Sequence, residues 1–195
     1  MAYARTFANS DGRYSSRLRR LALAVALFSA SLAPCQPAMP DYQIKAAFLY
    51  HFTQFIEWPR EEANEPFVIC VTGDKALRRS VEDLTRGKSV NARSILVKEI
   101  KEPDEAHSCH LVFLTSSFNR RLTRYLAAVH ALDVLTVGEP PGFLDQGGMI
   151  ELFLEDNRIR FDINEQALRD AHLRASSRLL RLARRVETGR AGGAP

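Results

Sequence analysis

The stretch IKAAFLYHFTQFIEWP, residues 44–59, concentrates aromatic side chains in one short segment. Its apolar face repeats at helical spacing and consists of Ile44, Ala47, Phe48, His51, Phe52 and Phe55. We predict a helix that Asp41 caps and that runs to about Trp58, where Pro59 limits its extension. The wide apolar arc favours packing against a sheet. Tyr50 and Trp58 fall outside its centre, so we expect them at a partner or dimer surface.

The segment before this helix has the order of a secretory signal. A stretch with five arginines and one aspartate precedes the apolar run 21–32, and small residues and prolines follow it. The run is shorter than the ~20 residues that cross a bilayer. We therefore predict a signal peptide over residues 1–38 and export to the periplasm, with an uncleaved anchor as the alternative. Ala33 and Ala38 are candidate cleavage positions, and the role of Cys35 stays open.

Removal of the signal changes the charge balance. The whole chain of 195 residues has 27 Lys+Arg and 23 Asp+Glu. After the signal, basic and acidic residues are equal in number, which gives no electrostatic reason to expect nucleic-acid binding. The remaining length suits one domain, predicted over residues 41–187, with a flexible tail over 188–195.

Two cysteines remain after the signal, Cys70 and Cys109, and each lies in an apolar, strand-like run. In an oxidising compartment this pair predicts one disulfide, and two buried free thiols are the alternative. A zinc site with the neighbouring His107 and His110 is the weaker interpretation, because the spacing does not supply a legible set of four ligands.

Strand-like runs alternate with helix-like segments along the rest of the chain. The predicted strands are residues 66–71, 94–100, 109–115, 134–137, 149–154 and 159–163, and the predicted helices between them are residues 75–86 and 119–132. This order predicts an α/β fold in three layers: a mostly parallel sheet of five to six strands, helices on both faces and a terminal β-hairpin, Rossmann-like in a loose sense.

The loops contain no recognisable set of catalytic residues. Residues 72–74, Thr-Gly-Asp, follow a strand but lack the glycine spacing of a dinucleotide site, so we expect a helix cap there. Residues 115–117 are expected to cap the next helix, with a phosphate-binding turn as the alternative. Gly147 and Gly148 indicate a sharp turn or a close backbone approach. We predict a protein that is not an enzyme and uses no cofactor or metal.

Asn164 is predicted to cap a long final helix that reaches about Val186. Its apolar stripe would be Leu168, Ala171, Ala175, Leu179, Leu182 and Val186, and its basic face would be Arg174, Arg178, Arg181 and Arg185. The basic face is either solvated or a docking strip for an acidic partner or an anion.

Taken together, these segments resemble the YfiR family of periplasmic regulators. The resemblance rests on residues 44–59, on the two cysteine-containing strands and on the block from Gly147 to Ala183, and it extends from Tyr42 to Arg185. It implies a non-enzymatic protein that binds the periplasmic sensor domain of a membrane diguanylate cyclase and represses cyclic di-GMP synthesis, which affects biofilm formation and motility.

The same resemblance implies further features. Cys70 and Cys109 match the strand-linking disulfide of the family, whereas a second disulfide of some members has no counterpart here. An outer-membrane lipoprotein that relieves the inhibition, and a homodimer, are the expected partners. The alternative function is a periplasmic small-ligand binding module, in which the loop 138–148, Arg60 and the C-terminal arginines receive an anion or an aromatic metabolite.

Overall fold

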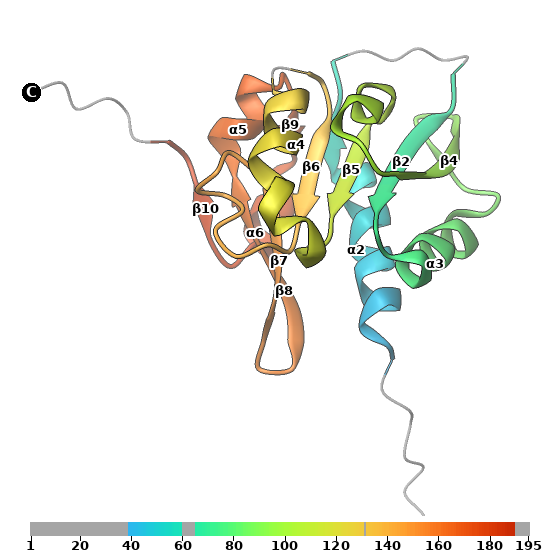
Figure 1. Ribbon diagram of the computed structural model, residues 1–195, viewed down its shortest axis with the longest axis horizontal. Helices are drawn as coiled ribbons and strands as arrows, with labels where there is room; N and C mark the ends of the chain where they lie inside the picture. The colour runs from blue at the N-terminus through green and yellow to red at the C-terminus, as the bar shows by residue number, and fades with distance from the viewer. Residues whose placement is uncertain (1–38, 60–64, 131, 190–195) are drawn as a thin grey trace, which may run out of the picture. The chain divides into compact units, whose positions relative to one another are not determined.

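A mixed sheet of eight strands lies between layers of helices in the computed structural model (Figure 1). The structure describes residues 39–59, 65–130 and 132–189. The predicted signal with Cys35, Arg60 and most of the predicted tail lie outside these residues. The sheet order is β10-β8-β7-β6-β5-β2-β4-β3, with strands β2 (Phe67–Thr72), β3 (Ser89–Val90), β4 (Arg93–Ile100), β5 (Leu111–Leu114), β6 (Leu135–Gly138), β7 (Ile150–Glu155), β8 (Arg158–Asn164) and β10 (Val186–Glu187).

The predicted three-layer α/β fold is confirmed. Neighbouring strands from β4 through β7 run parallel, while β7 and β8 form the antiparallel hairpin. The six predicted strands are present. The sheet has eight because β3 and β10 add two residues each at its edges, too few for a sequence pattern to mark.

Each face of the sheet has its own apolar core. One core contains residues of α2 (Asp41–Phe55), α3 (Lys75–Thr85), α5 (Glu165–Asp170) and α6 (Ser177–Leu182). The other contains α4 (Leu122–Val129) and the 3₁₀ turn η1 (Pro103–Ser108). A second 3₁₀ turn, η2 (Ser116–Arg121), forms the start of the helix predicted over 119–132. Strands buried on both faces explain the continuous apolar runs of β2 and β5.

Helix α2 is one turn shorter than predicted. It begins at Asp41, but Pro40 occupies the cap position and no side chain caps the helix. It ends at Phe55 because Ile56 is extended and pairs with Ala175, forming a two-stranded ribbon of β1 (Ile56–Glu57) and β9 (Arg174–Ala175).

The predicted long final helix is wrong. Asn164 does cap a helix, since its side chain accepts a hydrogen bond from the Ala167 N–H, but α5 ends at Asp170. His172 then adopts a left-handed backbone with φ of 55°, which no continuing helix allows. After β9, Ser176 caps the separate helix α6 through the Leu179 N–H. Strand pairing and two caps therefore override a residue pattern that suits one helix.

The predicted turns are present. The hairpin between β7 and β8 turns at Asp156 and Asn157, both at positive φ, as a tight primed turn requires. Asp74 caps α3 by accepting a hydrogen bond from the Leu77 N–H at 2.9 Å. The cap predicted for residues 115–117 is wrong, because Thr115 lies at the cap position of η2 but its side chain makes no capping hydrogen bond. Its hydroxyl instead meets that of Ser117 at 2.7 Å.

Candidate functional site

The four C-terminal arginines do not form one face, which corrects the predicted basic strip. Arg174 lies in β9, opposite Glu57. Arg178 and Arg181 lie in α6, and Arg185 precedes β10 and pairs with Asp162 at 3.4 Å. The prediction of one basic helical face was wrong because α6 includes only two of the four arginines.

Trp58 is a core residue, contrary to the expectation that it lies at the surface. It is 9% exposed, and its ring packs edge-on against Phe67 with the centroids 4.9 Å apart. The Nε1–H of Trp58 is buried and has no hydrogen-bond partner among the residues that the structure describes. Tyr50 is half-buried beneath Lys88, whose Nζ lies 4.4 Å from the ring centroid.

Apolar side chains of α2 and the hairpin pack together on one face of the sheet, and α6 lies against α2. Along α2, Phe48 packs against Phe161 of β8, with the ring centroids 5.7 Å apart. Two residues earlier in β8, on the same side of the strand, Ile159 pairs with Leu154. We define the apolar ridge as Phe48, Phe55, Leu154, Ile159 and Leu182. Leu154 and Leu182 are 61% and 63% exposed, which is unusual for large aliphatic side chains.

Arginine and histidine border this ridge. The Arg178 guanidinium lies 5.4 Å from the Phe55 ring centroid, and His51 stacks on the same ring at 6.4 Å. Arg181 is exposed on the adjoining position of α6. The ridge thus combines apolar side chains with a positively charged border, and this composition is typical of protein interfaces.

An ion-pair cluster fixes the segment after α6 to the hairpin. The Asp162 carboxylate is 2% exposed and accepts hydrogen bonds from Nε and Nη2 of Arg184. Arg184 also pairs with Glu155 at 3.0 Å and lies 4.1 Å from the Phe153 ring centroid. The hydrogen bonds with Asp162 raise the pKa of Arg184 above its usual range. This cluster, together with the backbone hydrogen bond from the Arg184 N–H to the Phe161 carbonyl, fixes the segment that follows Leu182 to β8.

Glu151 stands directly opposite Asp162 in the hairpin register. Burial raises the pKa of the Glu151 carboxyl, and the negative charges of Asp162 and Asp145 act in the same direction. A backbone hydrogen bond with Leu144 acts against them. The sequence pattern missed this cluster because the predicted long helix placed Arg184 away from the sheet.

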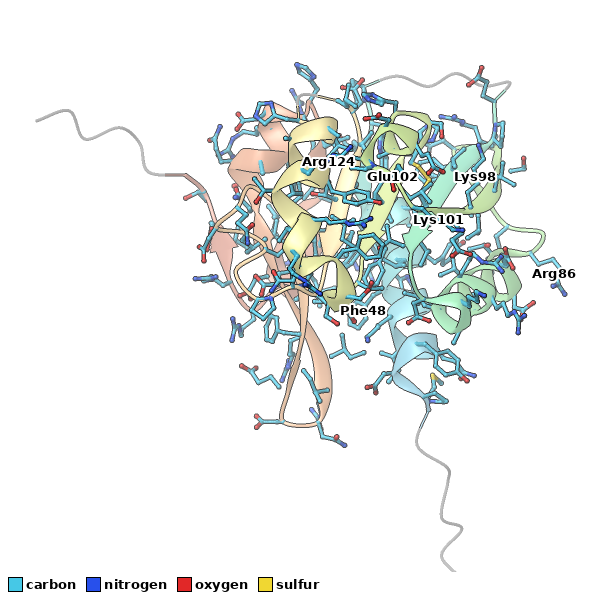
Figure 2. The ribbon with its side chains drawn as sticks, viewed as in Figure 1. Phe48, Arg86, Lys98, Lys101, Glu102 and Arg124 are labelled. Atoms are coloured by element: carbon cyan, nitrogen blue, oxygen red, sulfur yellow. A yellow bond between two sulfur atoms is a disulfide. The ribbon has the colours of Figure 1, made fainter. Side chains whose placement is uncertain are left out.

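The disulfide between Cys70 and Cys109 is confirmed, with a Cα–Cα distance of 5.9 Å. It joins β2 to the residue before β5 within the second core. Figure 2 shows it as the yellow bond between two sulfur atoms.

A cleft of about 770 Å³ lies beside the disulfide. Its lining includes Trp58, Lys98, His107, His110 and His172. In the loop 138–148, by contrast, the Phe143 ring packs directly against Gly138 and Gly148. A Cβ on either glycine would lie within 2.3 Å of that ring. The close approach predicted for Gly148 is therefore made by Phe143.

The described residues contain neither a candidate metal centre nor a helix that could span a membrane. Histidine, cysteine and carboxylate side chains do not gather there in a group of three that could hold a metal ion. In the same residues, no helix has the length and apolar character that crossing a bilayer requires.

The comparisons with known proteins agree with the fold. Among solved structures, the chain is similar to a conserved domain protein from Vibrio cholerae O1 biovar El Tor, with a TM-score of 0.50 and 8% identity. The alignment covers 76% of this chain and 61% of that one, so this likeness shows the fold alone. No curated protein matches the chain. The family model described as YfiR/HmsC-like matches residues 42–184, and the chain belongs to this family.

Proposed function

We propose that this protein is a periplasmic regulator that binds the periplasmic sensor domain of a membrane diguanylate cyclase and represses cyclic di-GMP synthesis. Membership of the YfiR/HmsC-like family, a family of regulators and not of catalysts, supports this proposal. The predicted export signal and the disulfide agree with a periplasmic location. Within the proposal, residues 41–187 are the regulatory domain, and a homodimer and an outer-membrane lipoprotein are further partners.

The observation that carries the proposal is the apolar ridge. Two exposed leucines, 61% and 63% accessible, extend a surface that otherwise packs as core. Exposed aliphatic and arginine side chains in one patch provide interface anchors, because burying them gains apolar contact while the charges select the partner. The mechanism is therefore binding, with Phe55, Arg178, Arg181 and Leu182 from the helices and Leu154 from the hairpin.

A pull-down tests the proposal. The protein lacking residues 1–38 is immobilised, and membrane proteins extracted from the same organism are applied. We expect retention of a diguanylate cyclase that has a periplasmic domain, and loss of it in the double variant Leu154→Asp, Leu182→Asp. The matched control is Leu96→Asp, because Leu96 is an exposed leucine of β4, at the opposite end of the strand order. Equal retention by the double variant would show that the ridge is not the contact.

The second candidate function is small-ligand binding, and the Trp58 indole favours it. A buried donor without a partner costs roughly 1–3 kcal/mol, and a ligand acceptor would remove that cost. The cleft beside it is lined by Lys98 and three histidines, which suit an anionic or aromatic ligand. Thermal-shift screening of nucleotides, amino acids and aromatic carboxylates tests this function. We expect a ligand that raises the melting temperature of the wild type but not that of Trp58→Phe. If the screen yields no such ligand, this function is contradicted.

A further inference from the structure

Strand β4 has an open edge beyond its short partner β3. The pairing of β3 with β4 includes only two residues of each strand, Ser89 with Ser94 and Val90 with Arg93. The turn that joins them contains Asn91 and Ala92, both at positive φ, as in a two-residue hairpin. In such a hairpin the closing pair exchanges backbone hydrogen bonds, so the N–H and C=O of Arg93 face β3, away from β2.

Alternation along β4 directs the backbone groups of Ile95, Val97 and Glu99 to the same side. No strand of the described residues pairs with them there, and no backbone hydrogen bond to them from outside the sheet is present. Natural sheets usually cover or shorten such an edge, because unpaired N–H and C=O groups pair readily with another extended chain.

Space lies on both sides of this edge. On the α3 side, a cleft of about 670 Å³ is lined by Ile95, Val97, Arg86 and Lys88. On the other side, the cleft beside the disulfide extends over Leu96 and Lys98. Leu96 is 41% exposed, and it is not among the residues that form the second core. An added strand would therefore place alternate side chains in two clefts.

The charges around the edge are unbalanced towards positive. Lys88, Lys98 and Lys101 have no carboxylate partner among the described residues, and Figure 2 shows Lys98 and Lys101 on the same side of the protein as Arg86. Three nearby carboxylates are paired with arginine: Glu82 and Glu99 with Arg78, and Asp83 with Arg86. The cleft beside the disulfide also contains Glu65 and Asp133, the latter paired with His172.

We propose that the β4 edge binds an extended, acidic peptide segment of a partner protein by strand addition. The backbone groups of Ile95, Val97 and Glu99 supply the hydrogen bonds, and the side chains on the two faces of the added strand, apolar on one and acidic on the other, enter the two clefts. The unpaired lysines select acidic residues. A second copy of this chain is the less suitable occupant, because edge-to-edge pairing would bring the lysines of two copies together. This surface lies apart from the apolar ridge and stands independently of the cyclase proposal.

Fluorescence anisotropy tests the proposal with a labelled peptide of alternating valine and glutamate. We expect saturable binding to the protein lacking residues 1–38. Val97→Pro, which removes one outward N–H, should weaken binding about tenfold or more, whereas Val97→Thr should keep it within about twofold, since one strong hydrogen bond is worth roughly this factor. Proline is tolerated at an outward position of an edge strand, and melting temperatures verify that both variants fold.

A peptide with N-methyl groups on alternate backbone nitrogens gives a test on the unaltered protein. Binding by strand addition requires that this peptide fails, and the charge argument requires that a valine–lysine peptide fails too. Absence of binding by the acidic peptide, or equal binding of the methylated or lysine peptide, would overturn the proposal. So would a dimer, measured by sedimentation, that Val97→Pro dissociates, because the edge would then belong to a second copy.

Discussion

The parallel strands β2, β5 and β6 and the segment that follows β8 are stabilised in different ways. The parallel strands are apolar along most of their length, and a disulfide joins β2 to the start of β5. After β8, the elements are short and depend on caps, a two-residue ribbon and ion pairs with Asp162. Burial on both faces fixes the first region, whereas specific polar contacts fix the second, and that second region positions part of the apolar ridge.

Loss of the disulfide should have the largest effect on stability. The bond closes a loop with a sequence separation of 39, for which chain entropy predicts roughly 4 kcal/mol of stabilisation. We expect the double variant Cys70→Ser, Cys109→Ser to unfold at a clearly lower guanidinium concentration than the wild type. Reductant should lower the midpoint of the wild type and leave that of the variant unchanged. A wild-type midpoint that reductant does not move would contradict the account.

Asp162→Asn should have the next largest effect, because it removes the buried charge that holds Arg184 and Arg185. Hydrogen bonds to charged groups contribute about 1.5–3 kcal/mol, so we expect a loss of that order in urea unfolding. Glu155→Gln is the matched control. Its pair with Arg184 is partly exposed and should contribute less than about 1 kcal/mol. If the two variants unfold alike, the cluster does not depend on the buried carboxylate.

Ser176→Ala distinguishes a helix start from a helix interior by the sign of its effect. As the cap of α6, Ser176 accepts a hydrogen bond from the Leu179 N–H, and its loss should cost about 1 kcal/mol. Inside one long helix, the same change would stabilise the protein by a few tenths of a kcal/mol, because alanine has the higher helix propensity. Thermal unfolding with Ser177→Ala as the control gives the sign.

Glu151→Gln should have the smallest effect, and that effect should depend on pH. Burial raises the folded-state pKa of Glu151, so the folded protein holds its proton more tightly than the unfolded chain. Its contribution is therefore present at low pH and is lost as the pH rises through the folded pKa. We expect Glu151→Gln to be more stable than the wild type at about pH 7 and equal to it at about pH 4. A difference in unfolding free energy that is the same at both pH values would contradict this cause.

The sequence predicts the parallel region well and the C-terminal region poorly, for a physical reason. Runs such as FVICVT in β2 are apolar because both faces are covered, and this local pattern alone marks a buried strand. Residues 165–186 suit a helix locally, yet the pairing of β9 with β1 and the contacts of Arg184 with Asp162 join residues far apart in sequence. The exposure of Leu154 and the burial of Trp58 likewise depend on tertiary packing, which the spacing of apolar residues in the sequence does not reveal.

Cellular cyclic di-GMP tests the central claim most directly. Three strains express the partner cyclase together with the wild-type protein, with the double variant Leu154→Asp, Leu182→Asp, or with Leu96→Asp. Mass spectrometry measures cyclic di-GMP in each strain. We predict low cyclic di-GMP with the wild type and with Leu96→Asp, and a severalfold rise with the ridge variant at equal protein abundance. Low cyclic di-GMP in all three strains, or no reduction by the wild type, would contradict repression through the apolar ridge.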